Sequence, residues 1–197
     1  MTAVIMFAKA PRRGYVKTRL SADVGRARAL EVYRQVGAQV AAGVARRYPL
    51  TVWYDPPDAE REMRVWLGEL QFQAQEGDDL GARMAHAFHV HFDRGDAPVV
   101  AIGADAPDVG AETIAQACRH LETADVVLGP ALDGGYYLIG LRRQADSLFR
   151  GIPWGGPRVM AVTLAACERV QLAVRQLGAL RDIDTGGDLA VLGIPLT

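Results

Sequence analysis

The chain has 197 residues, of which half are apolar and 23% carry a charge, as in ordinary globular proteins. A chain of this length buries roughly 70% of the surface that it exposes when unfolded, so one domain folds without a disulfide or a structural metal. The formal net charge of −1 leaves no basic field to hold a nucleic acid or an anionic membrane, and neither partner is expected.

Three further observations predict a cytoplasmic protein without a membrane span. No apolar run approaches the ~20 residues that a transmembrane helix needs. The apolar stretch before Lys9 is too short for a secretory signal peptide. The two cysteines, Cys118 and Cys167, lack CxxC spacing, and free buried thiols fit a reducing compartment.

Short apolar runs alternate along the chain with longer amphipathic segments, which is typical of a mostly parallel α/β sheet. The continuous apolar run Pro98–Gly103 is expected of a central strand that is covered on both faces. The predicted strands, in chain order, are Ala3–Ala8, Thr51–Tyr54, Gln71–Gln75, Pro98–Gly103, Asp125–Gly129, Tyr136–Leu141 and Gln171–Leu177.

The segments between these strands carry apolar residues at helical spacing, and each such stripe predicts a surface helix. A long stripe lies in Ala27–Arg46, and a second begins at Leu80 and ends at Phe92. Further helices are predicted over Ala111–Glu122, Arg158–Arg169 and Asp184–Leu192. No repeat, low-complexity segment or linker interrupts the pattern, so residues 1–197 are predicted to form one domain.

A basic loop, residues 9–20, follows the first predicted strand. Its five cationic side chains are Lys9, Arg12, Arg13, Lys17 and Arg19, and its Gly14 lets the backbone approach a ligand closely. Lys and Arg side chains suit phosphate groups, but a solvated basic loop remains the alternative. The loop is not a Walker loop, because Val16 stands where that motif needs glycine, and it lacks the G-x-G-x-x-G pattern.

Two aspartates follow the central strand. A carboxylate at the carboxyl end of such a strand faces the ligand crevice of an open α/β sheet, and its oxygens suit Mg²⁺ or Mn²⁺. We therefore expect Asp105 to bind a metal and Asp108 to cap the helix that begins near Ala111, with a capping role for Asp105 as the alternative.

Two later segments offer further polar groups. Asp133-Gly134-Gly135 fits a hairpin turn, and its glycines would also admit a ligand against bare backbone. Near the end of the chain, Asp184 or Thr185 can cap the last helix, while a second metal carboxylate from this region is the alternative. Trp154 lies in a loop rich in glycine and proline, where it can stack on a ligand.

Taken in order, six segments resemble one family along nearly the whole chain. They are AKAPRRGYVKTRL, EGDDLGARM, AIGADAPD, ALDGGYYLIGL, GIPWGGPRVM and RDIDTGGDL. The family is a bacterial GT-A-like group of uncharacterised glycosyltransferases, or nucleotide-diphospho-sugar transferases. The chain is more distantly similar to phospholactate guanylyltransferase and the molybdenum-cofactor nucleotidyltransferases. The resemblance implies a GT-A-type, Rossmann-like α/β/α sandwich of three layers with a mostly parallel mixed sheet.

The resemblance also implies roles for individual residues. Residues expected to act in catalysis are Lys17, Arg19 and Asp105, and those expected on the metal, Mg or Mn, are Asp105 and Asp184. The nucleotide would be bound by Lys9, Gly14, Lys17 and Arg19, while the nucleotide or acceptor side would be lined by Gly77, Asp79, Leu80 and Arg83. The acceptor would be bound by Asp133, Gly134, Gly135, Tyr136 and Trp154. Two departures are the glycine pairs Gly155-Gly156 and Gly186-Gly187, where the family usually has Ser or Thr and Pro-Glu.

Three functions are compatible with the sequence. A glycosyltransferase would bind a sugar nucleotide and a small-molecule acceptor, whereas a nucleotidyltransferase would join a nucleoside triphosphate to a phosphorylated acceptor. A nucleotide sensor without turnover would not need the carboxylates Asp105 and Asp184. The expected acceptor wall is apolar and aromatic, and Arg142 and Arg143 fall at the far end of its strand, which favours sugar transfer. The alternative is that Arg158 or Arg181 folds back into the site and binds a phosphorylated acceptor. Whether the protein forms a homodimer is left open.

Overall fold

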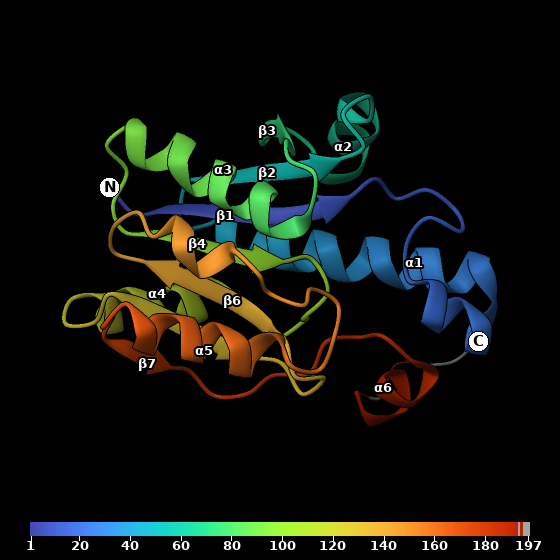
Figure 1. The fold of residues 1–197 in the computed structure, drawn as a ribbon. Coiled ribbons are helices and arrows are strands. Elements are labelled where there is room, and N and C mark those ends of the chain that lie inside the picture. The colour runs from blue at the N-terminus through green and yellow to red at the C-terminus, as the bar shows by residue number, and fades with distance from the viewer. Residues whose placement is uncertain (193, 195–197) are drawn as a thin grey trace.

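The computed structural model describes residues 1–192 and 194 (Figure 1). The strands are β1 (Ala3–Lys9), β2 (Leu50–Asp55), β3 (Gln71–Ala74), β4 (Val99–Gly103), β5 (Val126–Pro130), β6 (Tyr136–Leu141) and β7 (Val174–Gln176). The helices are α1 (Thr18–Ala45), α2 (Glu60–Leu67), α3 (Leu80–Asp93), α4 (Ala111–Leu121), α5 (Val159–Arg169) and α6 (Gly186–Val191), with a 3₁₀ turn, η1, at Asp146–Phe149. Within the described residues, no helix is both long and apolar enough to cross a bilayer.

The seven strands form one mixed sheet in the order β3-β2-β1-β4-β6-β5-β7. Only β6 runs antiparallel to its neighbours, β4 and β5, and all other pairs are parallel. The chain leaves β1 toward β2 and β3 on one side and later continues from β4 on the other side. The order therefore reverses between β1 and β4, where open α/β sheets form a crevice outside the carboxyl ends of their strands.

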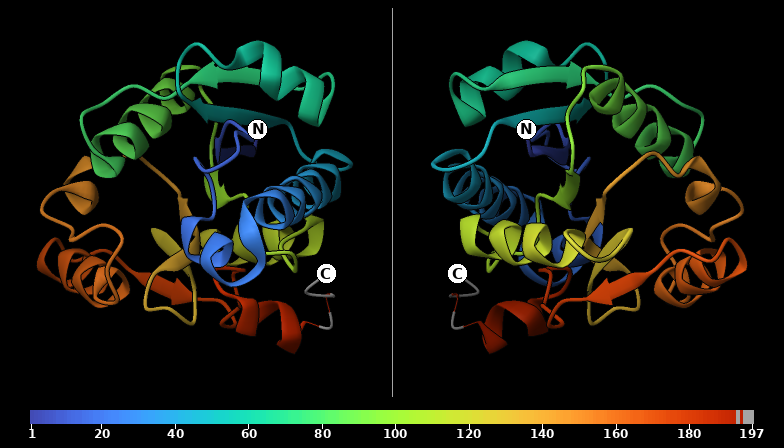
Figure 2. Two further views of the ribbon diagram at one scale, coloured as in Figure 1. Left: turned by 90° about the vertical axis from the view of Figure 1, so that its right-hand side faces the viewer. Right: turned by 90° about the vertical axis from the view of Figure 1, so that its left-hand side faces the viewer.

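Helices cover both faces of the sheet and make three layers (Figure 2). Along β1, Val4 and Met6 pack into one core with α1, α2, α4 and α6, while Ile5 packs into the other core with α3, α5 and η1. This alternation follows from the two-residue period of a strand, and it buries an apolar strand on both sides. The structure confirms the predicted Rossmann-like GT-A fold with a mostly parallel mixed sheet.

All seven predicted strands exist, but three predictions about helices are wrong. The first helix begins at Thr18, nine residues earlier than predicted, and Gly25 interrupts it with φ 78°. Helix α2 was not predicted, because it is only eight residues long and only Met63 in it is fully buried, with Trp66 and Leu67 partly buried. Asp108 does not cap α4: Gly110 occupies that position, and its N–H donates to the Thr113 hydroxyl at 3.3 Å.

Candidate functional site

The basic loop after β1 divides into a part that is anchored elsewhere and a part that faces the crevice. Arg12 donates to Glu62 of α2 from two nitrogens, at 3.0 and 2.6 Å, and also pairs with Asp58. Among the described residues, Lys9, Lys17 and Arg19 line the crevice, whereas Arg12 and Arg13 do not. The five cations of the loop therefore do not act as one phosphate cradle, and Arg12 instead fixes the loop to α2.

Three carboxylates converge opposite this loop. Asp105 follows β4, while Asp182 and Asp184 lie on the return segment after β7, whose Ile183 N–H donates to the Asp105 carbonyl at 3.1 Å. One oxygen from each carboxylate lies within 4.8 Å of the others. Ile183 is buried, so the alternation of an extended segment turns both of its neighbours away from the core. Asp105 and Asp184 were expected here from the sequence, whereas Asp182 was not.

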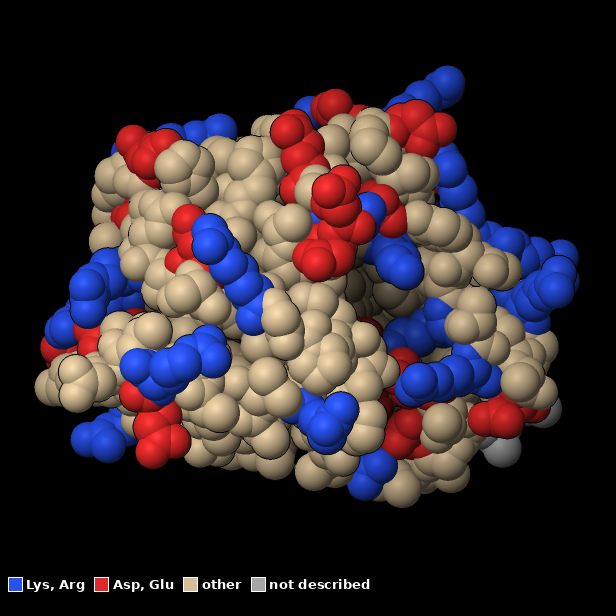
Figure 3. Space-filling view, in the orientation of Figure 1, with Lys and Arg blue, Asp and Glu red and all other residues tan. Residues whose placement is uncertain are grey.

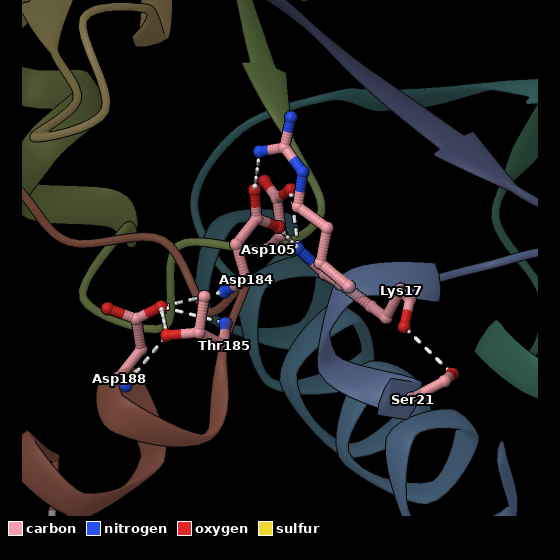
Figure 4. A network of polar contacts seen from close by, with 7 residues as sticks. Lys17, Ser21, Asp105, Asp184, Thr185 and Asp188 are labelled. Atoms are coloured by element: carbon pink, nitrogen blue, oxygen red, sulfur yellow. Dashed lines mark hydrogen bonds and ion pairs between the residues drawn. The ribbon is translucent and has the colours of Figure 1, made fainter. Parts of the chain in front are cut away.

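Lys17 joins two of these carboxylates (Figure 4). Its Nζ lies 3.0 Å from Asp105 Oδ2 and 2.8 Å from Asp184 Oδ1, and its side chain is only 8% exposed. Burial alone lowers the pKa of this ammonium, but the two carboxylates outweigh that effect and raise it above its ordinary value. Arg19 lies farther out, with Nη1 3.6 Å from Asp184 Oδ2 and a side chain that is 70% exposed.

The segment that carries Asp182 and Asp184 is held at the end that leads into α6. Thr185 caps α6 by accepting from the Asp188 N–H, and the Asp188 carboxylate accepts in turn from the Thr185 N–H at 2.8 Å. Asp23 of α1 accepts from the Gly186 N–H at 2.8 Å. This capping box and the contact with α1 fix the direction of the segment before any ligand binds.

Asp182 has an unusual acidity for an aspartate. Burial, followed by the charges of Asp105, Asp133 and Asp184, raises its pKa from 3.8 to about 6. A carboxyl group that is crowded by other carboxylates in this way keeps its proton to a higher pH than an ordinary aspartate does, unless a cation is nearby. The same crowding makes the triad a place where positive charge is favourable.

The first of two cavities at this edge, the cationic cavity, has a volume of about 540 Å³. Its cationic lining residues are Lys9, Lys17, Arg19 and Arg83. Figure 3 shows the surface hollowed here, with basic and acidic side chains on the rim. Arg83 of α3 is held by Asp55 at the end of β2, with 3.2 Å between Arg83 Nη1 and Asp55 Oδ1. Tyr15 donates to the other oxygen of Asp55, and this bond raises the pKa of the phenol.

The second cavity, the aromatic cavity, has a volume of about 330 Å³ and shares Asp105 and Asp184 with the first. Its walls include Phe7, Met84, Ile139, Tyr136 and Trp154, and Asp133 and Asp182 lie on its polar side. The Tyr136 and Trp154 rings meet edge to face, with 6.2 Å between centroids. Of the described residues that line this cavity, none is Lys or Arg.

Several predicted site residues lie outside both cavities and have structural roles. Asp79 caps α3 by accepting from the Ala82 N–H at 2.7 Å. Gly77, with φ 137°, stands where a Cβ would lie 2.8 Å from the Arg83 nitrogen, so the turn before α3 requires glycine. Gly14 and Gly134 also adopt positive φ, and a Cβ on Gly134 would collide with the Pro157 carbonyl. The remaining predicted residues line one cavity or both, and they are Lys9, Lys17, Arg19, Leu80, Arg83, Asp105, Asp133, Gly135, Tyr136, Trp154 and Asp184.

The triad fits a divalent cation chemically. Carboxylate oxygens are hard ligands of the kind that Mg²⁺ and Mn²⁺ prefer, and three of them within one ion's reach leave other positions for water or phosphate oxygens. The ammonium of Lys17 already makes ion pairs with two of the three carboxylates. The site therefore attracts cations, and the residues that would hold a metal are Asp105, Asp182 and Asp184.

Several solved structures share the fold of this chain. The chain is 41% identical to a protein from Desulfovibrio desulfuricans G20 that is provisionally named a nucleotide-diphospho-sugar transferase, with a TM-score of 0.92 over 97% of this chain and 85% of that one. Glucosyl-3-phosphoglycerate synthase from Mycobacterium tuberculosis, in complex with Mn²⁺ and UDP, is 13% identical, with a TM-score of 0.61 over 99% and 81%. The 4-diphosphocytidyl-2C-methyl-D-erythritol synthase of Anaerococcus prevotii DSM 20548 is 10% identical, with a TM-score of 0.63 over 97% and 95%.

Fold and site together define a GT-A-like protein of the class that contains glycosyltransferases and nucleotidyltransferases. A family model described as "Uncharacterized protein conserved in bacteria (DUF2064)" matches residues 38–156. The chain belongs to this family. None of the curated proteins matches it in sequence.

Proposed function

We propose that the protein is a metal-dependent glycosyltransferase that moves a sugar from a nucleotide donor to an uncharged acceptor. One observation carries this proposal: two cavities of opposite character meet at Asp105 and Asp184. The four cations that line them all face the cationic cavity, while the aromatic cavity has carboxylates and apolar walls. A reaction between an anionic donor and an uncharged acceptor needs such a division.

The donor would lie in the cationic cavity. Lys17 and Arg19 would stabilise the negative charge of its diphosphate, and Lys9 and Arg83 of the same cavity would contribute. This role is mainly electrostatic, since charge develops on the diphosphate as the bond to the sugar breaks. Arg83 suits it because Asp55 and Gly77 already fix its direction before the donor binds.

The carboxylates of Asp105, Asp182 and Asp184 would hold the divalent cation between the two cavities. The cation would supply positive charge beside the diphosphate, which makes that group a better leaving group. The chain orients these ligands by backbone contacts, above all the hydrogen bond from Ile183 to the Asp105 carbonyl.

The acceptor would lie in the aromatic cavity, where the flat rings of Tyr136 and Trp154 suit a sugar ring or another uncharged molecule. Its hydroxyl oxygen would form a bond to the anomeric carbon as the bond from that carbon to the diphosphate breaks. The nucleoside diphosphate would then leave. The proton of the hydroxyl would go to a lining carboxylate, for which Asp133 is suited because it lies outside the triad.

Nucleotidyl transfer is the second candidate. The four cations of the cationic cavity favour it, because a triphosphate carries more negative charge than a diphosphate. Its acceptor would bring a phosphate group, which calls for Lys or Arg in the second cavity. Arg142 and Arg143 do not meet this need, because both pair with Asp125 at the opposite edge of the sheet. The charge distribution therefore supports sugar transfer.

Product analysis tests this choice. The purified protein with Mn²⁺ is incubated with sugar nucleotides, nucleoside triphosphates and a small-molecule extract as the source of acceptors. Release of a nucleoside diphosphate from a sugar nucleotide supports the proposal, and release of pyrophosphate from a triphosphate overturns it. The same incubation with an Asp105→Asn variant controls for contaminating activities.

A further inference from the structure

The ammonium of Lys17 is paired with carboxylates, whereas a side chain that served only to bind phosphate would point freely into the cationic cavity. Its ammonium contacts Asp105 and Asp184 at 3.0 and 2.8 Å, and its side chain is far less exposed than that of Arg19. Figure 4 shows the side chain reaching from the start of α1 across to the two carboxylates. The same residue also lines the cationic cavity.

These contacts balance charge within the site. Three carboxylates with oxygens within 4.8 Å of one another repel, and a buried ammonium without a partner is costly as well. The pairing of Lys17 with Asp105 and Asp184 relieves both costs. The ammonium is thus the counter-ion of the triad that the chain itself provides.

A divalent cation on the triad would compete with this ammonium. It needs oxygens from the same carboxylates, and positive charges at contact distance in a partly buried site repel strongly. Lys17 has an alternative position, because its flexible four-carbon side chain starts at the edge of the cationic cavity. The ammonium can turn toward an anionic group there while α1 stays in place.

We propose that Lys17 couples metal binding to donor binding: its ammonium occupies Asp105 and Asp184 in the free protein, and the donor's diphosphate draws it away so that a divalent cation can bind. This inference rests on the proposed function, since it takes a diphosphate and a divalent cation as the ligands of this site. By linkage, the cation and the diphosphate then strengthen each other's binding through Lys17.

The test measures the affinity for Mn²⁺ alone, by the loss of the free-ion paramagnetic resonance signal, in the wild type and two variants. Lys17→Met removes the competing charge and keeps the length of the side chain. Lys9→Met is the matched control, because Lys9 lines the same cavity and its ammonium lies over the Tyr15 ring, 5.5 Å from its centroid. Circular dichroism of each variant reports whether the fold is kept, and Lys17→Gln replaces Lys17→Met if the latter does not fold.

The expected result is that Lys17→Met binds Mn²⁺ about tenfold or more tightly than the wild type, since one repelling charge at contact distance is lost. Lys9→Met should bind Mn²⁺ as the wild type does. If Lys17 were only a phosphate ligand, Mn²⁺ affinity without phosphate would not change, and equal or weaker binding by Lys17→Met overturns the inference. Absence of Mn²⁺ binding in all of the proteins overturns it as well.

A second titration adds inorganic pyrophosphate, whose own chelation of Mn²⁺ is measured without protein. Pyrophosphate should tighten Mn²⁺ binding by a larger factor in the wild type than in Lys17→Met, and equal factors would contradict the coupling. Neither titration depends on turnover, so the two proposals can fail separately. Unchanged Mn²⁺ binding would overturn the role of Lys17 even if nucleoside diphosphate release supports sugar transfer. Pyrophosphate release would overturn sugar transfer even if the titrations support the role of Lys17.

Discussion

The cationic and the aromatic cavity lie side by side on the carboxyl edge of one sheet, yet their linings differ in charge. The cationic cavity is built from the end of β1 and the loop after it, Gln75 after β3 and the start of α3, and holds Lys9, Lys17, Arg19 and Arg83. The aromatic cavity is built around β6 and the loop before α5, and of its described lining residues none is Lys or Arg. Both reach Asp105 and Asp184.

This difference has a topological cause. The cationic cavity borders the parallel strand β1, whose carboxyl end leads into the basic loop and the start of α1. The aromatic cavity borders β6, which runs antiparallel, so its first residue and the hairpin before it lie at this edge. The single reversed strand therefore brings a rigid, aromatic wall beside loops that carry charge. We infer that this arrangement separates the donor from the acceptor.

The largest effect is expected where the two cavities meet. Asp105→Asn should lower the rate of sugar transfer about a hundredfold or more, because the charge that holds the cation is lost. Steady-state kinetics measures this change. Asp108→Asn is the matched control, since Asp108 is exposed on the same loop and outside the triad. Full activity in Asp105→Asn would mean that the carboxylate does not serve the reaction.

A smaller effect is expected from a charge that belongs to the cationic cavity alone. Arg19→Ala should weaken binding of the donor about tenfold, the usual cost of one charged hydrogen bond, without changing the melting temperature. Arg13→Ala should leave binding unchanged, because Arg13 is exposed and does not line the cavity. Calorimetric titration of both variants with sugar nucleotides measures these affinities. If Arg19→Ala and Arg13→Ala bind the donor equally well, the basic loop is a solvated surface loop and not a phosphate site.

In the aromatic cavity, Trp154→Ala should lower kcat/KM for the acceptor about threefold to tenfold, which is the usual contribution of one aromatic contact. Donor affinity should stay the same. Trp66 offers the control, because it packs against Tyr33, with 5.1 Å between ring centroids, and lines neither cavity. Loss of donor affinity in Trp154→Ala would contradict the division between donor and acceptor sites.

The smallest effect concerns stability and pH. The pKa of Asp182 is about 6 in the folded protein and near 3.8 when unfolded, so the unfolded chain loses this proton first as pH rises. Asp182 thus lowers the free energy of unfolding progressively between about pH 4 and pH 6. In cation-free buffer, Asp182→Asn should melt a few degrees above the wild type at pH 7.5, since each kcal/mol of stability raises the melting temperature by about 2–4 °C in a chain of this size. The difference in melting temperature should disappear near pH 4. A difference that stays constant between pH 4 and pH 7.5 would refute this prediction.

Much of the fold could be predicted because a buried sheet leaves a strong pattern. Strands β1, β2, β4, β5 and β6 each show an apolar run, whereas the short edge strands β3 and β7 are more polar. Pro98–Gly103 was recognisable as central from its continuous apolar character. Helix α2 left no such signal, since most of its residues are charged or exposed and only Met63 is buried. The start of α1 was missed because Gly25 breaks the periodicity that the rest of the helix shows.

The site was predicted where position along a strand decides function, and missed where tertiary partners decide it. Asp105 was found because it directly follows the central strand. Arg12 could not be separated from Lys17 by sequence, since only the structure brings Glu62 of α2 beside it. Asp182 had a usable signal: it alternates with Asp184 around the apolar Ile183, and this spacing turns both carboxylates to one side of an extended segment.

The most direct test of the division between the cavities is a crystal structure with Mn²⁺ and a nucleoside diphosphate, with each common base tried in turn. We expect an anomalous Mn²⁺ signal about 2.0–2.6 Å from oxygens of Asp105 and Asp184. Both phosphorus atoms should lie on the side of Lys9, Arg19 and Arg83. A diphosphate beside Tyr136 and Trp154, or Mn²⁺ bound away from the triad, would contradict it.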